Sequence, residues 1–140
     1  MVASAPTASV VYVVDDDDAV LGSLQFLLET DGFDVRTFRT GAALLNGILG
    51  DVDCFVIDYK MPTISGIELA IHLRSQYAGT PIILITGYPE DSIEEKAAAV
   101  GIRHILLKPH LEENLVSRVR SAIEESLPAG RWRADLREAT

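Results

Sequence analysis

Polar side chains follow short apolar runs at several points in this sequence. Each run of four or five apolar residues is typical of an interior strand of a parallel sheet, so the polar residue after it falls at the strand's carboxyl end. Three neighbouring carboxylates would repel one another unless a cation lay between them, and Mg²⁺ binds carboxylate and phosphate oxygens together. A carboxylate, a lysine and a hydroxyl around such an ion favour phosphoryl chemistry, with the carboxylate as a possible acceptor. The residues in these positions are Asp15, Asp16, Asp58, Thr86 and Lys108.

Each of these residues has an ordinary structural interpretation when taken alone. The acidic run at 15–18 could be only a loop and a helix cap, and Asp58 could simply begin a turn. Thr86 could close a strand, and Lys108 could be a surface lysine. The carboxyl ends of parallel strands meet at one edge, where the ligands of open α/β sheets bind. Their shared position, rather than any single residue, therefore indicates a site.

Strand and helix patterns alternate along the chain. Apolar residues spaced three and four apart mark the helices, and suitable N-caps precede several of them, namely Asp17 or Asp18, Thr40 and Ser65. This alternation predicts an α/β fold, a doubly wound parallel sheet of five strands with five helices on its two faces. We predict strands over 10–14, 33–38, 53–58, 82–86 and 102–107, and helices over 18–32, 40–50, 66–77, 89–100 and 111–126.

Length and charge limit the class of protein. The 140 residues carry a formal net charge of −9, which disfavours direct binding of nucleic acid. The single cysteine, Cys54, falls inside a predicted strand and allows no intrachain disulfide. No apolar run reaches the ~20 residues of a membrane span and the start lacks the features of a secretory signal, so we expect a cytoplasmic protein without membrane contact.

The sequence predicts one domain with a short segment on either side. We expect a flexible lead-in at 1–8 and one domain at 9–127. The segment 128–140 holds three arginines and a tryptophan against the acidic Asp135 and Glu138, and could be a linker stub, a docking tail or plain disorder. We expect it to be a short flexible or loosely helical tail.

Five short motifs lie at the strand ends and at the start of one helix. They are Val-Val-Asp-Asp at 13–16, Val-Ile-Asp-Tyr-Lys-Met-Pro at 56–62, Ser-Gly-Ile-Glu-Leu at 65–69, Ile-Thr-Gly at 85–87 and Leu-Lys-Pro at 107–109. With these motifs the chain resembles a CheY-like response-regulator receiver domain of two-component signalling, and it looks most similar to the FixJ-type branch. The resemblance covers roughly residues 9–126 and implies the flavodoxin-like strand order 2-1-3-4-5. It also implies a protein that is phosphorylated rather than an enzyme that turns over a substrate.

The resemblance implies a role for each acidic residue. Asp58 would accept the phosphoryl group from a sensor histidine kinase or a histidine phosphotransfer protein. Asp16 and Asp58 would bind Mg²⁺ directly together with the backbone carbonyl of Lys60, and Asp15 would act mainly through water.

The resemblance also implies a switch, from which this sequence departs in part. Thr86 would bind the phosphoryl group together with Lys108, and the peptide bond before Pro109 would be cis. Ile105 stands where the family usually has Tyr or Phe as the aromatic half of the switch, and His110 stands where Phe is usual. Coupling of Thr86 to an aromatic flip is therefore not expected to follow the family pattern.

Three further residues flank the expected site, and by position two of them, Lys60 and Tyr88, should tune how readily water reaches a phosphoryl group. The three residues are Lys60, Gly87 and Tyr88.

Two alternatives stay open at this point. The chain could be a single-domain regulator that acts by protein contact, which we favour, or the receiver of a truncated FixJ/LuxR-type transcriptional regulator. In either case residues 89–126 could form a homodimer face. A third interpretation, a haloacid-dehalogenase-type phosphatase with Asp16 as nucleophile, fits Asp16-Asp17-Asp18-Ala19-Val20 but gives Asp58 no role.

Overall fold

The computed structural model describes residues 8–87, 92–108 and 111–126. Residues 1–7 of the predicted lead-in, the predicted tail at 128–140, and Tyr88, Pro109 and His110 lie outside the described residues. The expectations for these residues, including the cis bond before Pro109, stay predictions. No helix in the described ranges is both long and apolar enough to cross a membrane.

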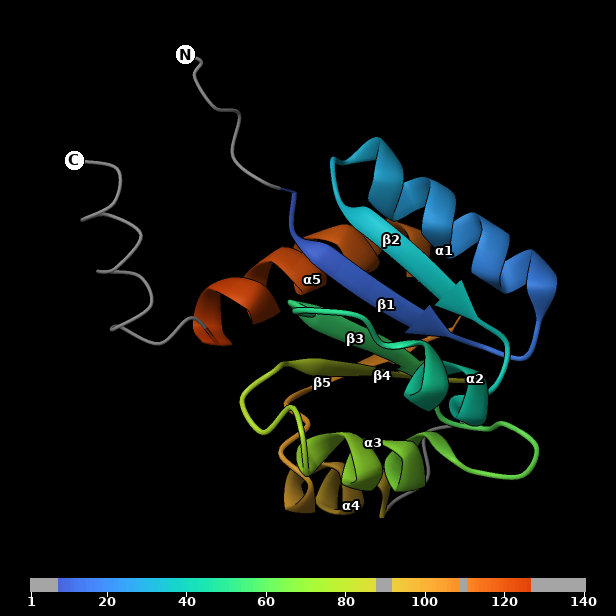
Figure 1. Ribbon diagram of the computed structural model, residues 1–140, viewed down its shortest axis with the longest axis vertical. Coiled ribbons are helices and arrows are strands. Elements are labelled where there is room, and N and C mark those ends of the chain that lie inside the picture. The colour runs from blue at the N-terminus through green and yellow to red at the C-terminus, as the bar shows by residue number, and fades with distance from the viewer. Residues whose placement is uncertain (1–7, 88–91, 109–110, 127–140) are drawn as a thin grey trace.

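Five parallel strands form the centre of the molecule (Figure 1). Their order is β2-β1-β3-β4-β5, as the resemblance implied. The all-apolar runs occupy the interior positions and the alternating run, β2, lies at an edge, because an edge strand does not need two buried faces. The strands are β1 Val10–Val14, β2 Asp34–Phe38, β3 Cys54–Asp58, β4 Ile82–Thr86 and β5 His104–Leu107.

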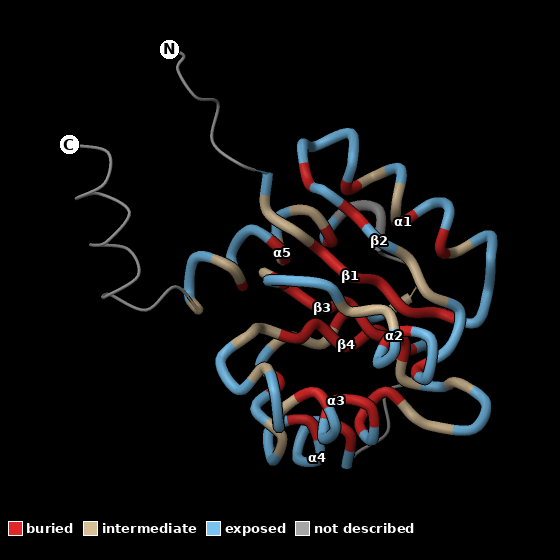
Figure 2. The backbone as a smooth tube through the Cα atoms, viewed as in Figure 1, coloured by how far each residue is buried: buried red, intermediate tan, exposed pale blue. Residues whose placement is uncertain are grey.

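Helices cover both faces of the sheet, and each face has its own apolar core (Figures 1 and 2). Buried leucines and Val119 from α1 and α5 pack on one face. Leu44, Leu73 and Ile93 bring α2, α3 and α4 onto the other face. The helices are α1 Asp18–Thr30, α2 Gly41–Gly47, α3 Gly66–Arg74, α4 Ile93–Ala99 and α5 Leu111–Ser126.

Three predicted caps are confirmed. The Asp17 carboxylate accepts hydrogen bonds from the first turn of α1, and the Thr40 hydroxyl accepts one from the first turn of α2. Ser65 forms a capping box with Glu68 at the start of α3. These caps fix the helix starts that follow the strand ends, so they also fix the loops around the carboxyl edge of the sheet.

Two predicted boundaries were wrong because local turns use the backbone groups there. The predicted strand at 102–107 begins only at His104, since the Ile102 N–H donates to the Ala97 carbonyl and closes α4. The predicted helix at 66–77 ends at Arg74, whose guanidinium donates to the carbonyls of Tyr77 and Thr80 and holds that segment in a turn. The strands predicted at 33–38 and 53–58 and the helices predicted at 18–32 and 40–50 are also shorter, at 34–38, 54–58, 18–30 and 41–47.

The loop between β3 and α3 contains a strained turn. Thr63 has φ 75°, and the Ile64 N–H donates to the Pro62 carbonyl across it at 2.8 Å. A three-residue turn with positive φ at its centre is costly for a β-branched residue. The strain lies four residues beyond Tyr59 in the loop that leaves the predicted acceptor Asp58.

Glycine at this turn should relieve the strain. We expect Thr63→Gly to raise the free energy of unfolding by about 1 kcal/mol, because the strain it removes exceeds the added entropy of the unfolded chain. Urea denaturation measures the change. Thr63→Val keeps the β-branch and should give no gain, and a loss of stability in the glycine variant would contradict the expectation.

Candidate functional site

The register of the sheet places two carboxylates side by side at the carboxyl edge. Val14 of β1 pairs with Ile57 of β3, so Asp15 and Asp58 follow on neighbouring strands. The Asp15 N–H donates to the Phe38 carbonyl, and this bond continues the ladder to β2 beyond the strand end. The predicted convergence of Asp15 and Asp58 therefore follows from ordinary parallel pairing.

Three carboxylates form a cluster at this edge. One oxygen each from Asp15, Asp16 and Asp58 lie within 4.8 Å of one another. Asp15 is 1% exposed and Asp58 is 5% exposed, whereas Asp16 lies on the surface. The cluster therefore has a dry inner side and an open outer side, which suits an ion that keeps some of its waters.

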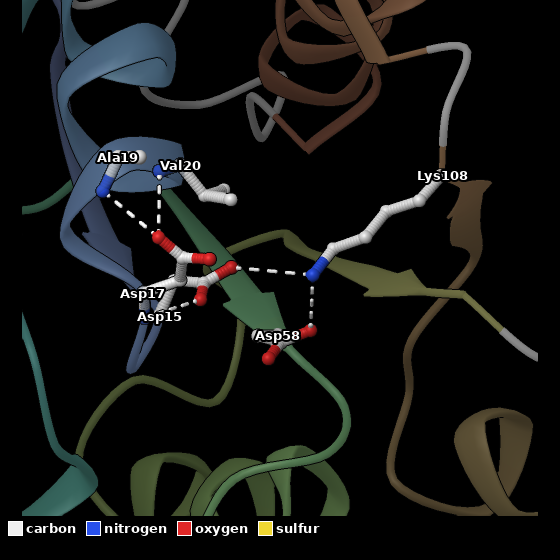
Figure 3. Close-up of polar contacts among 6 residues, drawn as sticks. All are labelled: Asp15, Asp17, Ala19, Val20, Asp58 and Lys108. Carbon is white, nitrogen blue, oxygen red and sulfur yellow. Dashed lines mark hydrogen bonds and ion pairs between the residues drawn. The ribbon is translucent and has the colours of Figure 1, made fainter.

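Lys108 lies between the two buried carboxylates (Figure 3). Its Nζ is 3.4 Å from Asp58 Oδ1 and 3.6 Å from Asp15 Oδ2. Asp15 Oδ1 accepts a hydrogen bond from the Asp17 N–H at 2.9 Å. Asp15 Oδ2 is buried and accepts no hydrogen bond from the described part of the chain.

Asp15 Oδ2 has an ion-pair contact with Lys108 Nζ, but at 3.6 Å this contact is longer than a hydrogen bond. A buried carboxylate oxygen without a closer donor or cation is costly. This oxygen faces a cluster made only of oxygen ligands, which are the ligands that Mg²⁺ prefers. The residues present therefore fit a hard divalent cation.

The charges of the cluster also favour the binding of a cation. Burial, together with the Asp15 carboxylate, raises the pKa of Asp58 to about 6 against the opposing effect of Lys108. Burial also raises the pKa of Asp15, against the Asp17 N–H and Lys108. Burial alone would lower the pKa of Lys108, but the two carboxylates outweigh it and the pKa is raised. One lysine therefore does not neutralise the cluster, and a second positive charge would relieve it.

A hollow of about 490 Å³ opens over the cluster. It leaves Asp58 accessible from the solvent side. Its lining comprises Asp15, Asp16, Asp17, Asp58, Lys60, Gly87 and Lys108.

The structure brings most of the predicted site residues to this edge, where some line the hollow and others are buried beneath it. Lys60 and Gly87 line the hollow, as flanking residues should. Thr86 ends β4 and is buried, and its carbonyl accepts a hydrogen bond from the Lys108 N–H, so the predicted switch pair is joined through the backbone. Ile105 lies farther down β5, opposite Leu84, and packs half-buried in the core with α2, α3 and α4.

One residue that supports the site was not predicted. Gly66 begins α3 directly under the end of β3, and its N–H donates to the Tyr59 carbonyl at 2.8 Å. A Cβ on Gly66 would lie 2.6 Å from the Asp58 carbonyl oxygen and 2.9 Å from Leu84 Cδ1. The glycine lets the helix approach the backbone of Asp58. The Ser-Gly pair at a helix start is the sequence signal that could have identified it.

Comparison with known proteins gives a consistent result. The family model described as the response regulator receiver domain matches residues 11–120. The chain is 35% identical over 125 residues to the transcriptional regulatory protein FixJ of Bradyrhizobium diazoefficiens, a match that covers 89% of this chain and 61% of that protein. The match to the response regulator protein TodT of Pseudomonas putida covers 52% of that relative, so the chain spans between about half and three fifths of these relatives.

A solved structure also shares the arrangement. The chemotaxis protein CheY4 of Vibrio cholerae superposes with a TM-score of 0.77 at 28% identity, and the match covers 83% of this chain and 99% of that one.

Proposed function

Because this chain belongs to the response regulator receiver family, we propose that it takes up a phosphoryl group on Asp58 from a histidine kinase or a histidine phosphotransfer protein. The observation that carries the proposal is the buried pair of Asp15 and Asp58 with Lys108 between them and a hollow open above. Asp58 is the member of the pair that ends the central strand, β3. Both carboxylates line the hollow, but Asp58 is the more exposed of the two, at 5% against 1% for Asp15, so we propose it as the acceptor.

The residues around Asp58 have complementary roles in the transfer. One Asp58 carboxylate oxygen forms a bond to phosphorus as the phosphorus–nitrogen bond of the donor phosphohistidine breaks, and the leaving imidazole keeps the electron pair. Lys108 lies close enough to offset the negative charge that gathers on the phosphoryl oxygens. Thr86, at the end of the adjacent strand, would bind a phosphoryl oxygen through its hydroxyl.

Mg²⁺ would be held by Asp15, Asp16 and Asp58, with the backbone carbonyl of Lys60 as a further ligand. When bound, it would screen the phosphoryl oxygens from the carboxylates and hold them near Asp58. The buried Asp15 Oδ2, which accepts no hydrogen bond from the described part of the chain and lies 3.6 Å from Lys108 Nζ, and the excess negative charge of the cluster support this assignment.

Three residues would set how the phosphorylated state is read and how long it lasts. Ile105 packs in the core below Thr86 and would respond to movement of that strand end by repacking an aliphatic side chain. Lys60, at the rim of the hollow, would control the access of water to the phosphoryl group. The same role for Tyr88 is proposed from its place in the sequence.

Intact mass spectrometry after incubation with acetyl phosphate tests the proposal. We expect one phosphoryl adduct on the wild-type protein, none on Asp58→Asn, and none on either protein without Mg²⁺. Asp34→Asn, an exposed carboxylate on β2, is the matched control and should take up the adduct normally. An adduct that persists in Asp58→Asn would show that Asp58 is not the phosphoryl acceptor. Continuous release of phosphate that depends on Asp16 would instead support the phosphatase interpretation.

The way in which the phosphorylated chain transmits its signal is proposed only as a general type of mechanism. We infer that the chain acts by conformational change and protein contact, as a single-domain regulator or as the receiver of a longer FixJ-type regulator, without substrate turnover. The segment 89–126 is the proposed homodimer face, and the exposed apolar side chain of Leu107 on β5 supports it. Solution mass with and without a stable phosphoryl mimic measures this, and a monomer in both states would reject the dimer.

A further inference from the structure

Two hollows lie at the edge of the sheet opposite the carboxylate cluster, where the strands begin. They flank the turn at 78–81, which lines both of them. Ser126, the last residue of α5, also lines both. The chain therefore leaves the described fold beside these two hollows.

The two hollows differ in charge. The first, of about 370 Å³, is lined by Arg74, Arg103 and the hydrogen-bonded pair of His104 and Glu125, and we call it the basic hollow. The second, of about 330 Å³, is lined by Asp51 and Asp53 and by no basic side chain among the residues described, and we call it the acidic hollow. A cationic segment would enter the acidic hollow and be repelled by the basic one.

The acidic hollow also offers apolar contacts. Tyr77 is half-buried against the edge of the Phe55 ring, and its hydroxyl donates to the Gly50 carbonyl at 3.4 Å. Ile123 of α5 contributes a half-buried aliphatic side chain to the lining. In the loop that leads into the hollow, Leu49 is 73% exposed although the Tyr12 hydroxyl anchors its backbone. Rigidly held apolar surface beside two carboxylates suits a ligand that is both aromatic and cationic.

The chain supplies a stretch of this kind at 131–133, after α5, and the acidic residues of the same segment, Asp135 and Glu138, follow it. The only tryptophan of the chain, Trp132, stands between Arg131 and Arg133. We propose that the segment 127–140 docks in the acidic hollow, with Trp132 against Tyr77 and Ile123 and the flanking arginines beside Asp51 and Asp53. Five residues lie between Ser126 and Trp132, and the stretch spans at most about 20 Å when extended, so the segment can reach a hollow that Ser126 itself lines.

Because the segment is covalently attached beside the hollow, even weak contacts are enough to keep it bound. A segment tethered at the rim of its own site experiences an effective concentration in the millimolar range, so contacts too weak to hold a free peptide can keep it bound. Asp51 is the exposed carboxylate of the pair, whereas one Asp53 oxygen already accepts a hydrogen bond from the Val10 N–H. Asp51 is therefore the residue whose charge should matter most.

Quenching of the fluorescence of Trp132 by acrylamide tests the docking, because no other residue of the chain is a tryptophan. In the full chain we expect Trp132 to be quenched on the order of threefold less than in the free 127–140 peptide. Asp51→Lys should raise quenching towards the peptide value, and high salt should act in the same direction by screening the pairs. Glu29→Lys, an equal charge reversal at an exposed site on α1, is the control and should change nothing.

A charge swap separates docking from general effects of substitution. Arg131→Glu with Arg133→Glu should expose Trp132, and adding Asp51→Lys to that variant should restore part of its protection. Quenching in the wild-type chain equal to that of the peptide, or protection indifferent to Asp51→Lys, would overturn the proposal. Protection that appears only as the protein concentration rises would mean docking onto a second copy, and it would overturn docking within one chain.

Discussion

Asp58→Asn is expected to make the metal-free protein more stable at neutral pH, by roughly 2 to 3 kcal/mol in the free energy of unfolding. The ordinary pKa of this carboxyl is 3.8, and burial with the Asp15 carboxylate raises it to about 6 in the folded protein. Asparagine keeps the shape of the side chain and a carbonyl oxygen for Lys108, and it removes the charge. The substitution therefore relieves the repulsion and desolvation that the fold sustains at this position.

The pH dependence of the wild-type protein has a definite sign. Between about pH 4 and pH 6 the folded form of Asp58 binds more protons than the unfolded form, so raising the pH through this range lowers stability. Below about pH 4 the carboxyl is protonated in both states, and the stability that its protonation contributes is fully present. That stability is lost as the pH rises through the folded value of about 6, so the gain from Asp58→Asn should grow from pH 4 to pH 7.

Thermal unfolding with a chelator present, at several pH values, measures this prediction. At pH 7 we expect the melting temperature of Asp58→Asn to exceed that of the wild type by about 6 to 10 °C. Adding Mg²⁺ should stabilise the wild type and narrow the difference, because a bound cation relieves the same repulsion. Asp34→Asn should change the free energy of unfolding by less than about 0.5 kcal/mol, as exposed positions usually do. A destabilised Asp58→Asn protein at pH 7 would show that the pair with Lys108 outweighs the cost of burial.

The parts of the fold that depend on periodic patterns could be predicted from the sequence. The apolar runs at Val10–Val14 and Cys54–Asp58 predict interior strands, and the caps Thr40 and Ser65 predict helix starts. Once the strands are parallel, the convergence of Asp15, Asp58 and Lys108 follows, because each directly follows or ends a strand.

The parts that depend on side chains distant in sequence could not be predicted. Arg74 ends its own helix by donating to four backbone carbonyls, two of them at Val100 and Gly101 across the fold. The Tyr12 hydroxyl fixes the backbone of Leu49, 37 residues away. Neither contact leaves a periodic signal, because each is a single long-range hydrogen-bond set. The positive φ at Thr63 is likewise set by the turn and not by the residue type.

The clustered carboxylates of the site repel one another and so destabilise the fold, and the packing of the strands and of α3 around them opposes this repulsion. The carboxylates are held together by the pairing of β1 with β3 and by the close approach of α3 to the end of β3. The close approach depends on Gly66, where a Cβ would meet the Asp58 carbonyl oxygen at 2.6 Å and the Tyr59 Cα at 3.0 Å. These atoms belong to the backbone at the end of β3 and cannot turn aside as a flexible side chain could.

Gly66→Ala is therefore expected to destabilise the protein by about 1 to 3 kcal/mol, even though alanine favours helix more than glycine does. Either α3 must move away from the sheet or the end of β3 must shift, and both displace Asp58 relative to Lys108. We expect formation of the phosphoryl adduct from acetyl phosphate to slow on the order of tenfold, since small displacements at a reacting group have large effects on rate.

Gly22→Ala adds the same methyl group, but it is expected to raise stability where Gly66→Ala lowers it. Gly22 lies within α1, and a Cβ there would meet nothing within 4 Å, so alanine should stabilise the protein by about 0.5 to 1 kcal/mol through helix propensity alone. Urea denaturation and time-resolved mass spectrometry on both variants separate the two effects. A Gly66→Ala protein as stable and as fast as Gly22→Ala would show that α3 can move without moving Asp58. A destabilised protein with a normal rate would show that the strain is absorbed within the helix, and slowing together with loss of stability would establish that the position of α3 sets the position of the acceptor.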